Sequence, residues 1–423
     1  MKPYIIILGM LALVHSESAF AYLDPGSGSA IISVITATIG SLWHSLKSVF
    51  YCLIGKKSSS QPLISQDNSL VIFNEGKAYW GTFRPLIEEL IKEKIQFRYL
   101  TLDLHDPALQ IESQYMQSKR LSLNSFSLAE LKNIKAPVMV STTPNIGTKG
   151  YPIAKPAGVG DLIHIFHHVG DVSIYKRHSL DHYDSVILVG DFQEKSIRNL
   201  EKLRNLKQKK LVSLGLLYLD DLYQNLPPSK CLPEDRPTIL IGSSWGKKGC
   251  LQTYGTEFIN SLANAGFNII IRPHPQSAVS EPTFIAQCKR ETKSPHVKWD
   301  GEISPSEAMH KSQLLISDTS SLRFDYAFLY EKPIITLEIP RGNLTEFEAI
   351  DLEEHWHESA AYKIGTIANG ETIMNIVDIV NDEINNRSSS DLEKFREQTV
   401  MNFGKCAPNI VNYINKLNVS QGS

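Results

Sequence analysis

The stretch that decides the fold is "SDTSSLRFDYAFLYEKP", which runs from Ser317 to Pro333. The apolar run "QLLI" leads into it and the apolar run "IITL" leads out of it. Between these runs, three consecutive hydroxyl residues precede a helical pattern that places Leu322, Tyr326 and Leu329 on about one face. The pattern predicts a strand, a helix and a second strand, which is the repeating unit of parallel α/β sheets.

The same alternation extends in both directions along the chain. Short apolar runs such as "LVIFN", "APVMVST" and "SVILVG" alternate with helical segments over residues 70–224, and a second series covers residues 238–400. The Pro-rich stretch 225–237 predicts a linker between them, residues 58–69 predict another, and residues 401–423 form a C-terminal tail. We therefore expect two Rossmann-like α/β domains that face a cleft, with ligands at the carboxyl ends of the strands.

Composition limits the classes of function. The length of 423 residues suits two domains, and 43 Lys+Arg against 45 Asp+Glu give no global basic field for nucleic acid. Five scattered cysteines exclude a disulfide scaffold. The acidic and histidine-bearing stretches "LDLHD" (102–106) and "EEHWHE" (353–358) are more typical of solvated turns or helix faces than of metal sites, so no bound metal is expected.

The N-terminus predicts a membrane region ahead of the two domains. Residues 1–21 have the layout of a secretory signal that ends in "AFA". Residues 22–57 contain an apolar segment long enough to cross a bilayer, although His44 and Lys47 also suit a helix that lies on the membrane surface. With cleavage and one crossing, the catalytic part would be cytoplasmic at the bacterial inner membrane; without the crossing it would be exported.

The first candidate site segment is "IFHHVGD", where His167 and His168 end an apolar strand and Gly170 permits a close turn. A neutral imidazole at a strand end could take a proton from a hydroxyl nucleophile. Adjacent strand residues point to opposite faces, so at most one of the two histidines should face the cleft. The alternative is that one or both are ordinary buried or hydrogen-bonded histidines.

Two further candidate segments follow strands of the second series. In "IIIRPHPQS", Arg272 offers a planar fork suited to phosphate, and His274 could donate to a phosphate oxygen or protonate a leaving group. In the opening stretch, Thr319, Ser320 and Ser321 stand at a helix start, where exposed N–H groups and the helix dipole favour an anion.

Together these segments resemble the CDP-glycerol glycerophosphotransferase family, the polymerases and primases of teichoic-acid-type polyol phosphate chains. "FHHVG", "RPHP" and "SDTSSLRFD" occur in the family's order, and "EKPII" follows them. The resemblance covers about residues 70–400. The first motif departs from the family pattern, in which glycine follows the histidine directly, so the acceptor is not fixed by the resemblance.

The resemblance implies a GT-B fold and a membrane-associated transferase. An acceptor hydroxyl on a cell-surface glycan or lipid-linked acceptor would attack the phosphorus of a CDP-activated polyol and release CMP. The family's base falls on His167 or His168, and its second essential histidine falls on His274. Ser320 and Ser321 match the hydroxyls that hold donor phosphates, with Asp318 and Asp325 as supports. No tightly bound cofactor is implied. The full set of donor-phosphate residues expected is Arg272, Ser317, Asp318, Thr319, Ser320 and Ser321.

Two other functions remain compatible with these residues. One is a nucleotide-sugar glycosyltransferase or epimerase of the same fold, because a fold alone does not decide chemistry. The other is a non-catalytic relative that binds glycan or lipid-linked precursors at the membrane.

Overall fold

A computed structural model describes residues 69–121, 125–227, 235–302, 305–340 and 344–422. The predicted signal and membrane segments, residues 1–21 and 22–57, lie outside these ranges. Among the described residues, no helix combines the length and apolar content needed to cross a membrane. The described residues within 69–121 and 132–422 form one compact unit that holds both sheets. Of the other unit, the described part belongs to α4 (Ser125–Lys132).

The first sheet has seven parallel strands in the order β3-β2-β1-β4-β5-β6-β7. Their sequence alternation had predicted all but β3, because "MQSKR" buries only its first residue well. The strands are β1 (Leu70–Asn74), β2 (Phe97–Thr101), β3 (Met116–Arg120), β4 (Lys135–Ser141), β5 (Gly158–Ile165), β6 (Ser185–Leu188) and β7 (Lys210–Ser213).

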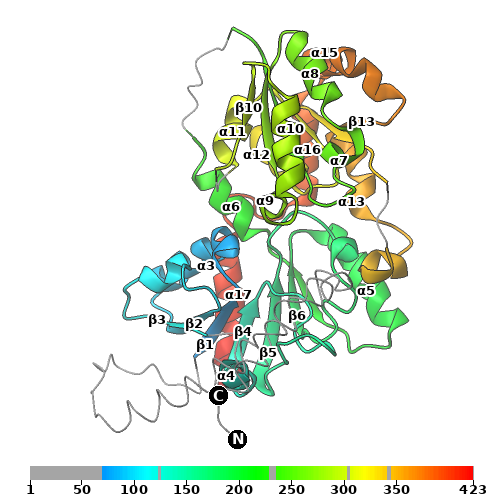
Figure 1. The fold of residues 1–423 in the computed structure, drawn as a ribbon. Helices are drawn as coiled ribbons and strands as arrows, with labels where there is room; N and C mark the ends of the chain where they lie inside the picture. Colours follow the sequence, from blue (N-terminus) through cyan, green and yellow to red (C-terminus); the bar gives the residue numbers. More distant parts are fainter. Residues whose placement is uncertain (1–68, 122–124, 228–234, 303–304, 341–343, 423) are drawn as a thin grey trace, which may run out of the picture. The chain divides into compact units, whose positions relative to one another are not determined.

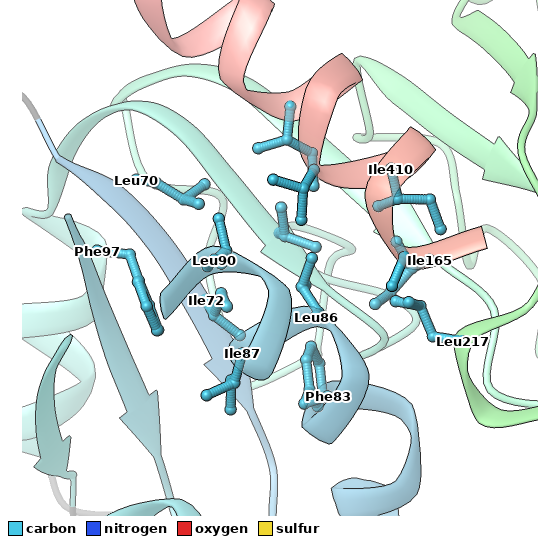
Figure 2. Packing of buried hydrophobic residues seen from close by; sticks show 14 of the residues in the cluster. Leu70, Ile72, Phe83, Leu86, Ile87, Leu90, Phe97, Ile165, Leu217 and Ile410 are labelled. Carbon is cyan, nitrogen blue, oxygen red and sulfur yellow. The ribbon is translucent and has the colours of Figure 1, made fainter. Parts of the chain in front are cut away.

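The helices of this half pack their apolar faces on the sheet. In α3 the buried residues Phe83, Leu86, Ile87 and Leu90 recur at helical spacing, and Figure 2 shows them facing the strands. The α-helices of this half are α3 (Trp80–Lys92), α5 (Glu194–Leu203) and α6 (Leu217–Gln224), and its 3-10 helices are η2 (Lys77–Tyr79), η3 (Pro107–Gln110), η4 (Val172–Ile174) and η5 (Asp191–Gln193).

The residues predicted as a C-terminal tail are part of this first core. Helix α17 (Cys406–Gly422) buries Ile410, Val411 and Ile414 in the same cluster as the β1 and α3 side chains. Figure 2 shows Ile410 near Ile165 and Leu217, and Figure 1 shows α17 in red beside the first sheet. The final helix therefore stabilises the half of the protein to which it returns, rather than the half that precedes it in sequence.

The second sheet has six parallel strands in the order β10-β9-β8-β11-β12-β13. The strands are β8 (Thr238–Ser243), β9 (Asn268–Pro273), β10 (Val297–Trp299), β11 (Leu314–Ser317), β12 (Ile334–Leu337) and β13 (Gly365–Ala368). The helices are α7 (Cys250–Tyr254), α8 (Glu257–Asn264), α9 (Pro275–Ser280), α10 (Pro282–Glu291), α11 (Ser306–Lys311), α12 (Leu322–Tyr330), α15 (Ile376–Asn386) and α16 (Ser389–Thr399), with η8 (Thr372–Asn375) before α15. The opening stretch forms β11, α12 and the lead into β12, as predicted.

A segment of the second half makes contacts with the first half. This crossing segment, residues 344–359, holds η6 (Leu344–Glu346), η7 (Glu348–Asp351) and α13 (Trp356–Ser359), and α14 (Ala361–Ile364) follows it. Lys176 and Phe347 form an isolated antiparallel bridge. Arg204 of the first half is bonded to both Glu348 and Asp351. The two sheets are thus joined by charged contacts as well as by the chain.

Candidate functional site

The three predicted segments lie at the carboxyl ends of their strands. In the second sheet, β9, β8 and β11 are neighbouring parallel strands. Their carboxyl ends therefore bring together His274, the loop after Ser243 and the turn from Asp318 to Ser321. In the first sheet, β1, β4 and β5 are neighbours, and polar residues follow each of them. This is the edge at which open α/β sheets bind ligands.

Asp318 organises the site in the second half. Its carboxylate, which is fully buried, accepts hydrogen bonds from the backbone N–H groups of Cys250 at 2.8 Å, of Ser244 at 3.0 Å and of Ser320 at 3.1 Å. Gly249 allows this tight loop, since a Cβ there would lie 2.3 Å from the Ser244 carbonyl oxygen. Asp318 therefore holds two loops together and has its charge neutralised by backbone dipoles.

The hydroxyl series divides into buried and accessible members. Ser317 is fully buried and its hydroxyl donates to the Gly242 carbonyl at 2.5 Å. With Asp318 also buried, these two side chains build the turn instead of lining it, which corrects their predicted contact with phosphate. Thr319 is exposed, and Ser320 and Ser321 are half-buried, so these three hydroxyls remain the candidates.

The hydroxyl series does little to cap α12. Ser321, the N-cap residue, has helical backbone angles and makes no side-chain cap hydrogen bond. The Ser320 hydroxyl accepts from the Leu322 N–H only at 3.4 Å. The hydroxyls at this helix start are therefore little used by the helix itself, and they remain available to an anion that approaches the N–H groups.

His274 is held in a defined orientation and tautomer. It is the N-cap of α9, and its Nδ1 accepts a hydrogen bond from the Gln276 N–H at 3.1 Å. The backbone N–H of His274 donates to the Ser243 carbonyl oxygen at 3.1 Å. Burial lowers the pKa of His274, and nearby Asp318 opposes that shift. A neutral His274 thus carries its proton on Nε2, where it can donate to a ligand.

Arg272 is engaged with a neighbouring strand end. Its Nη1 donates to the Asp300 carboxylate at 2.7 Å, and both side chains are about nine-tenths buried. This pair joins the ends of β9 and β10.

The helix after the hydroxyl series carries two buried charged residues. Arg323, which the sequence analysis did not select, is 2% exposed and donates to the Ser320 carbonyl and the Thr336 hydroxyl. Burial lowers its pKa to about 10, although Asp318 acts in the opposite direction. Asp325 is 3% exposed, and burial raises its pKa to about 7. Arg323 places a cation beneath the turn that the resemblance assigns to donor phosphate.

The two adjacent histidines of the first half differ in exposure. Both lie in the loop after β5, which ends at Ile165, so they do not end the strand as expected. His168 is buried, and its Nε2 has no hydrogen-bond partner among the described residues. His167 is half-buried, and its Nδ1 lies 2.8 Å from the Thr142 hydroxyl. A Cβ at Gly170 would come within 3.0 Å of the His168 ring, so glycine there allows the close approach.

Burial lowers the pKa of His167 to about 4 and that of His168 well below its usual value. Both imidazoles are therefore neutral near pH 7, and each keeps one ring nitrogen with a lone pair. Because His167 is the more exposed of the two, it is the better placed to receive a proton from a bound molecule.

A second polar group lies on the same edge, and the sequence analysis missed it. Glu75 follows β1 directly and its carboxylate accepts a hydrogen bond from the Tyr151 hydroxyl at 2.8 Å. Tyr79 packs edge-on against His167, with ring centroids 4.9 Å apart. We call Glu75, Tyr79, Thr143 and Tyr151 the Glu75 cluster. The available signal was position, because Glu75 and Thr143 follow the ends of β1 and β4 closely.

The stretches interpreted as solvated are partly buried, which corrects that interpretation. In "EEHWHE", His357 is 3% exposed and its Nε2–H donates to the Thr319 carbonyl at 2.5 Å. In "LDLHD", Asp106 is 1% exposed and is bonded to Asn74 and Tyr99. Both have protein partners. Among the described residues, no group of three or more His, Cys, Asp or Glu side chains is arranged to hold a metal ion.

A hollow of about 600 Å³ lies at the other edge of the second sheet. It is lined by residues at the beginnings of strands, such as Thr238, Asn268 and Lys298. His274 follows the opposite end of β9, and Asp318 follows the same end of the parallel strand β11, so the hollow is separate from the site described above.

Comparisons with known proteins show the fold. No protein-family model matches the sequence, and no curated protein matches it. The wall teichoic acid polymerase TagF, solved with CDPG, is 14% identical, with a TM-score of 0.52 over 92% of this chain and 99% of the other. A putative UDP-N-acetylglucosamine 2-epimerase from Listeria monocytogenes is 12% identical, with a TM-score of 0.57 over 83% of this chain and 96% of the other.

A second UDP-N-acetylglucosamine 2-epimerase matches with a TM-score of 0.54 at 12% identity, over 82% of this chain and 95% of the other. The protein thus has the two-domain GT-B architecture that the motifs predicted. The resemblance to the CDP-glycerol glycerophosphotransferase family is confirmed as a likeness of fold.

Proposed function

We propose that this protein is a transferase that moves a glycerol-phosphate or related polyol-phosphate unit from a CDP-activated donor to an acceptor hydroxyl. The observation that carries the proposal is the fixed tautomer of His274. Its Nδ1 is occupied by the Gln276 N–H, so its Nε2–H is directed away from that bond, at the edge where Asp318 gathers two loops. A donor N–H beside an anion-favouring helix start suits a pyrophosphate.

The donor would be held mainly by the second half. Thr319, Ser320 and Ser321 offer hydroxyls at the start of α12, and Arg323 adds a buried positive charge below them. Arg272 stays part of the proposed donor set, although its pair with Asp300 makes it the member with the least freedom. Asp318 acts through the backbone that it orders.

The chemical step would be a displacement at phosphorus. The acceptor oxygen forms a bond to the phosphorus that carries the polyol, the bond from that phosphorus to the bridging oxygen breaks, and CMP leaves with that oxygen. His167 would take the hydroxyl proton on Nε2 while Nδ1–H donates to Thr142. The low pKa of His167 keeps it neutral beforehand, and the charge of a bound pyrophosphate would raise that pKa and strengthen the base.

The donor class can be tested by nucleotide release. CDP-glycerol, CDP-ribitol and UDP-N-acetylglucosamine would each be incubated with the protein and with bacterial membranes as a source of acceptor. We expect CMP release from a CDP-polyol at least about tenfold faster than any UDP release, a difference of about 1.4 kcal/mol in barrier. Faster turnover of the UDP-sugar would contradict the proposal and favour the epimerase or glycosyltransferase alternative. No turnover with retained glycan binding would favour a non-catalytic protein.

The membrane placement is part of the proposal and rests on the sequence of residues 1–57 alone. A lipid-linked or cell-surface acceptor would be reached from the inner membrane, with the catalytic half-domains in the cytoplasm. Fractionation of cells that produce the full chain, with protease protection to report the side, tests this placement. Recovery in the soluble fraction would contradict it.

A further inference from the structure

Glu75 is a partly buried carboxylate that forms no ion pair within the part of the chain that the structure describes. Its hydrogen-bond partner is the Tyr151 hydroxyl at 2.8 Å. Burial raises its pKa, and the hydroxyls of Tyr151 and Thr143 partly oppose the shift. Lys77 and Lys149 are exposed residues of the neighbouring segments, and neither contributes to that shift. An ionised carboxylate in this setting is energetically unfavourable, because only neutral hydroxyls compensate for the hydration that it loses on burial.

Three other buried carboxylates, those of Asp106, Asp220 and Glu348, stabilise the structure through protein partners. Asp106 caps η3 and bonds to Tyr99. Asp220 accepts from the N–H groups that begin α17, and Glu348 is paired with Arg204. Glu75 neither caps a helix nor joins an ion pair among the described residues, so its retention favours a role toward a ligand.

The position of Glu75 connects it to the candidate base. It follows β1, and β1 and β5 both flank β4, so the ends of these strands meet at one edge. Tyr79 lies between them: its ring packs edge-on against His167, with ring centroids 4.9 Å apart, and burial and then the nearby Glu75 raise its pKa. The Thr143 hydroxyl is fully buried and makes no hydrogen bond to the described residues, although it lies close enough to Glu75 to oppose the effect of burial on the pKa of that carboxyl. The cluster therefore presents polar atoms beside His167.

The chemistry of the cluster suits hydroxyl groups. A carboxylate accepts hydrogen bonds from hydroxyls, phenol and threonine hydroxyls can donate or accept, and tyrosine rings pack against C–H faces. A phosphate placed beside Glu75 would meet a like charge with no counter-ion in the cluster. We propose that Glu75, Tyr79, Thr143 and Tyr151 bind the uncharged, hydroxyl-bearing end of the acceptor, a polyol or sugar terminus, and reject a phosphorylated end.

This inference rests on the proposed transferase function, and it specifies which end of the acceptor enters the site. The variants that test it are Glu75→Gln, which keeps the shape and removes the charge, and Tyr151→Phe, which removes the hydroxyl that holds Glu75. Glu112→Gln, an exposed glutamate of the same half, is the matched control. Far-UV circular dichroism and melting would show that each variant is folded.

The first measurement is CMP release from CDP-glycerol with increasing free glycerol or sn-glycerol 3-phosphate. We expect glycerol to stimulate release and the phosphorylated compound not to. Glu75→Gln should raise the KM for glycerol roughly tenfold or more, as expected for a lost hydrogen bond to a charged group, whereas Glu112→Gln should leave that KM unchanged. Equal stimulation by both compounds, or an unchanged KM, would overturn the inference.

The second measurement separates this inference from the proposed function. Saturation-transfer NMR with glycerol and with sn-glycerol 3-phosphate reports binding whether or not any donor is turned over. If no CDP-polyol is a substrate, binding of glycerol that is lost in Glu75→Gln and kept in Glu112→Gln still supports the site. Preferential binding of the phosphorylated compound, or glycerol binding unaffected by Glu75→Gln, contradicts it.

Discussion

The Nε2–H of His357 donates a hydrogen bond to the carbonyl of Thr319 at 2.5 Å. The bond joins α13 of the crossing segment to the turn that carries the hydroxyl series. The ring also packs edge-on against Phe324, with centroids 5.1 Å apart. Burial is the main cause of the lowered pKa of His168 in the first half, and His167 and then His357 add to it. One buried imidazole thus touches the proposed donor turn and is near the histidine pair of the other half.

Replacing His357 should weaken donor binding more than folding. His357→Leu removes the partly buried hydrogen bond to the Thr319 carbonyl, which costs about 0.5–1.5 kcal/mol and frees the turn. We expect the Kd for CMP, measured by calorimetry, to rise about tenfold. His357→Gln, whose amide can reach the same carbonyl, should retain most of the affinity. A Leu variant that is folded and binds CMP like the wild type would remove His357 from this role.

Two substitutions of His274 separate its proposed role in catalysis from its role as the N-cap of α9. Asn is a favoured N-cap residue, so His274→Asn should keep the cap of α9 while it removes the Nε2–H. We expect the transfer rate to fall about 100-fold or more, with an unchanged melting temperature. His274→Ala should lose the same activity and, in addition, about 1 kcal/mol of stability. His105→Asn, at an exposed histidine, is the control. Full activity in the Asn variant would assign His274 to capping alone.

The raised pKa of Asp325 predicts that the free energy of unfolding falls as the pH rises. An unfolded Asp has a pKa of about 3.9, and burial raises that of folded Asp325 to about 7. Between these values the folded state binds more protons than the unfolded state, so raising the pH destabilises the fold. The loss is on the order of a few kcal/mol by pH 8. Asp325→Asn avoids this loss, so its melting temperature should exceed that of the wild type at pH 8.

The pH series provides the control for this prediction. The advantage of Asp325→Asn should shrink as the pH is lowered toward 5, where the wild-type carboxyl is mostly protonated, and Glu112→Gln should show no such trend. A difference in melting temperature between Asp325→Asn and the wild type that stays constant from pH 5 to pH 8 would mean that the pKa of Asp325 does not change on folding.

The sequence could predict the sheets because their strands are buried on both faces. Runs such as "LVIFN" and "IIIRP" are nearly continuous β-formers between helical segments, and the strand ends then place His274 and Asp318 at one edge. β3 and β13 lie at the two sheet edges. Their sequences, "MQSKR" and "GTIA", carry too little apolar pattern to be recognised.

The missed site residues depend on contacts between distant parts of the chain. Glu75 and Tyr151 are 76 residues apart, and no local pattern in either segment indicates their hydrogen bond. His357 stands in a charged stretch whose composition favours a solvated helix face, yet its Thr319 partner is 38 residues away. Ser317 was overestimated for the opposite reason, because its neighbours in sequence are hydroxyls while its hydroxyl is used by Gly242.

Two ion pairs of the crossing segment should contribute very differently to the free energy of unfolding. Arg204 is 10% exposed and pairs with Glu348, which is 1% exposed, whereas both side chains of the Lys195–Glu354 pair are mostly in solvent. Arg204→Ala leaves a buried carboxylate without its cation and should lower the free energy of unfolding by about 3–5 kcal/mol. Lys195→Ala, the matched control, should cost less than about 1 kcal/mol. Urea unfolding of both variants measures the difference. Similar midpoints for the two variants would show that the buried contact does not hold the halves together.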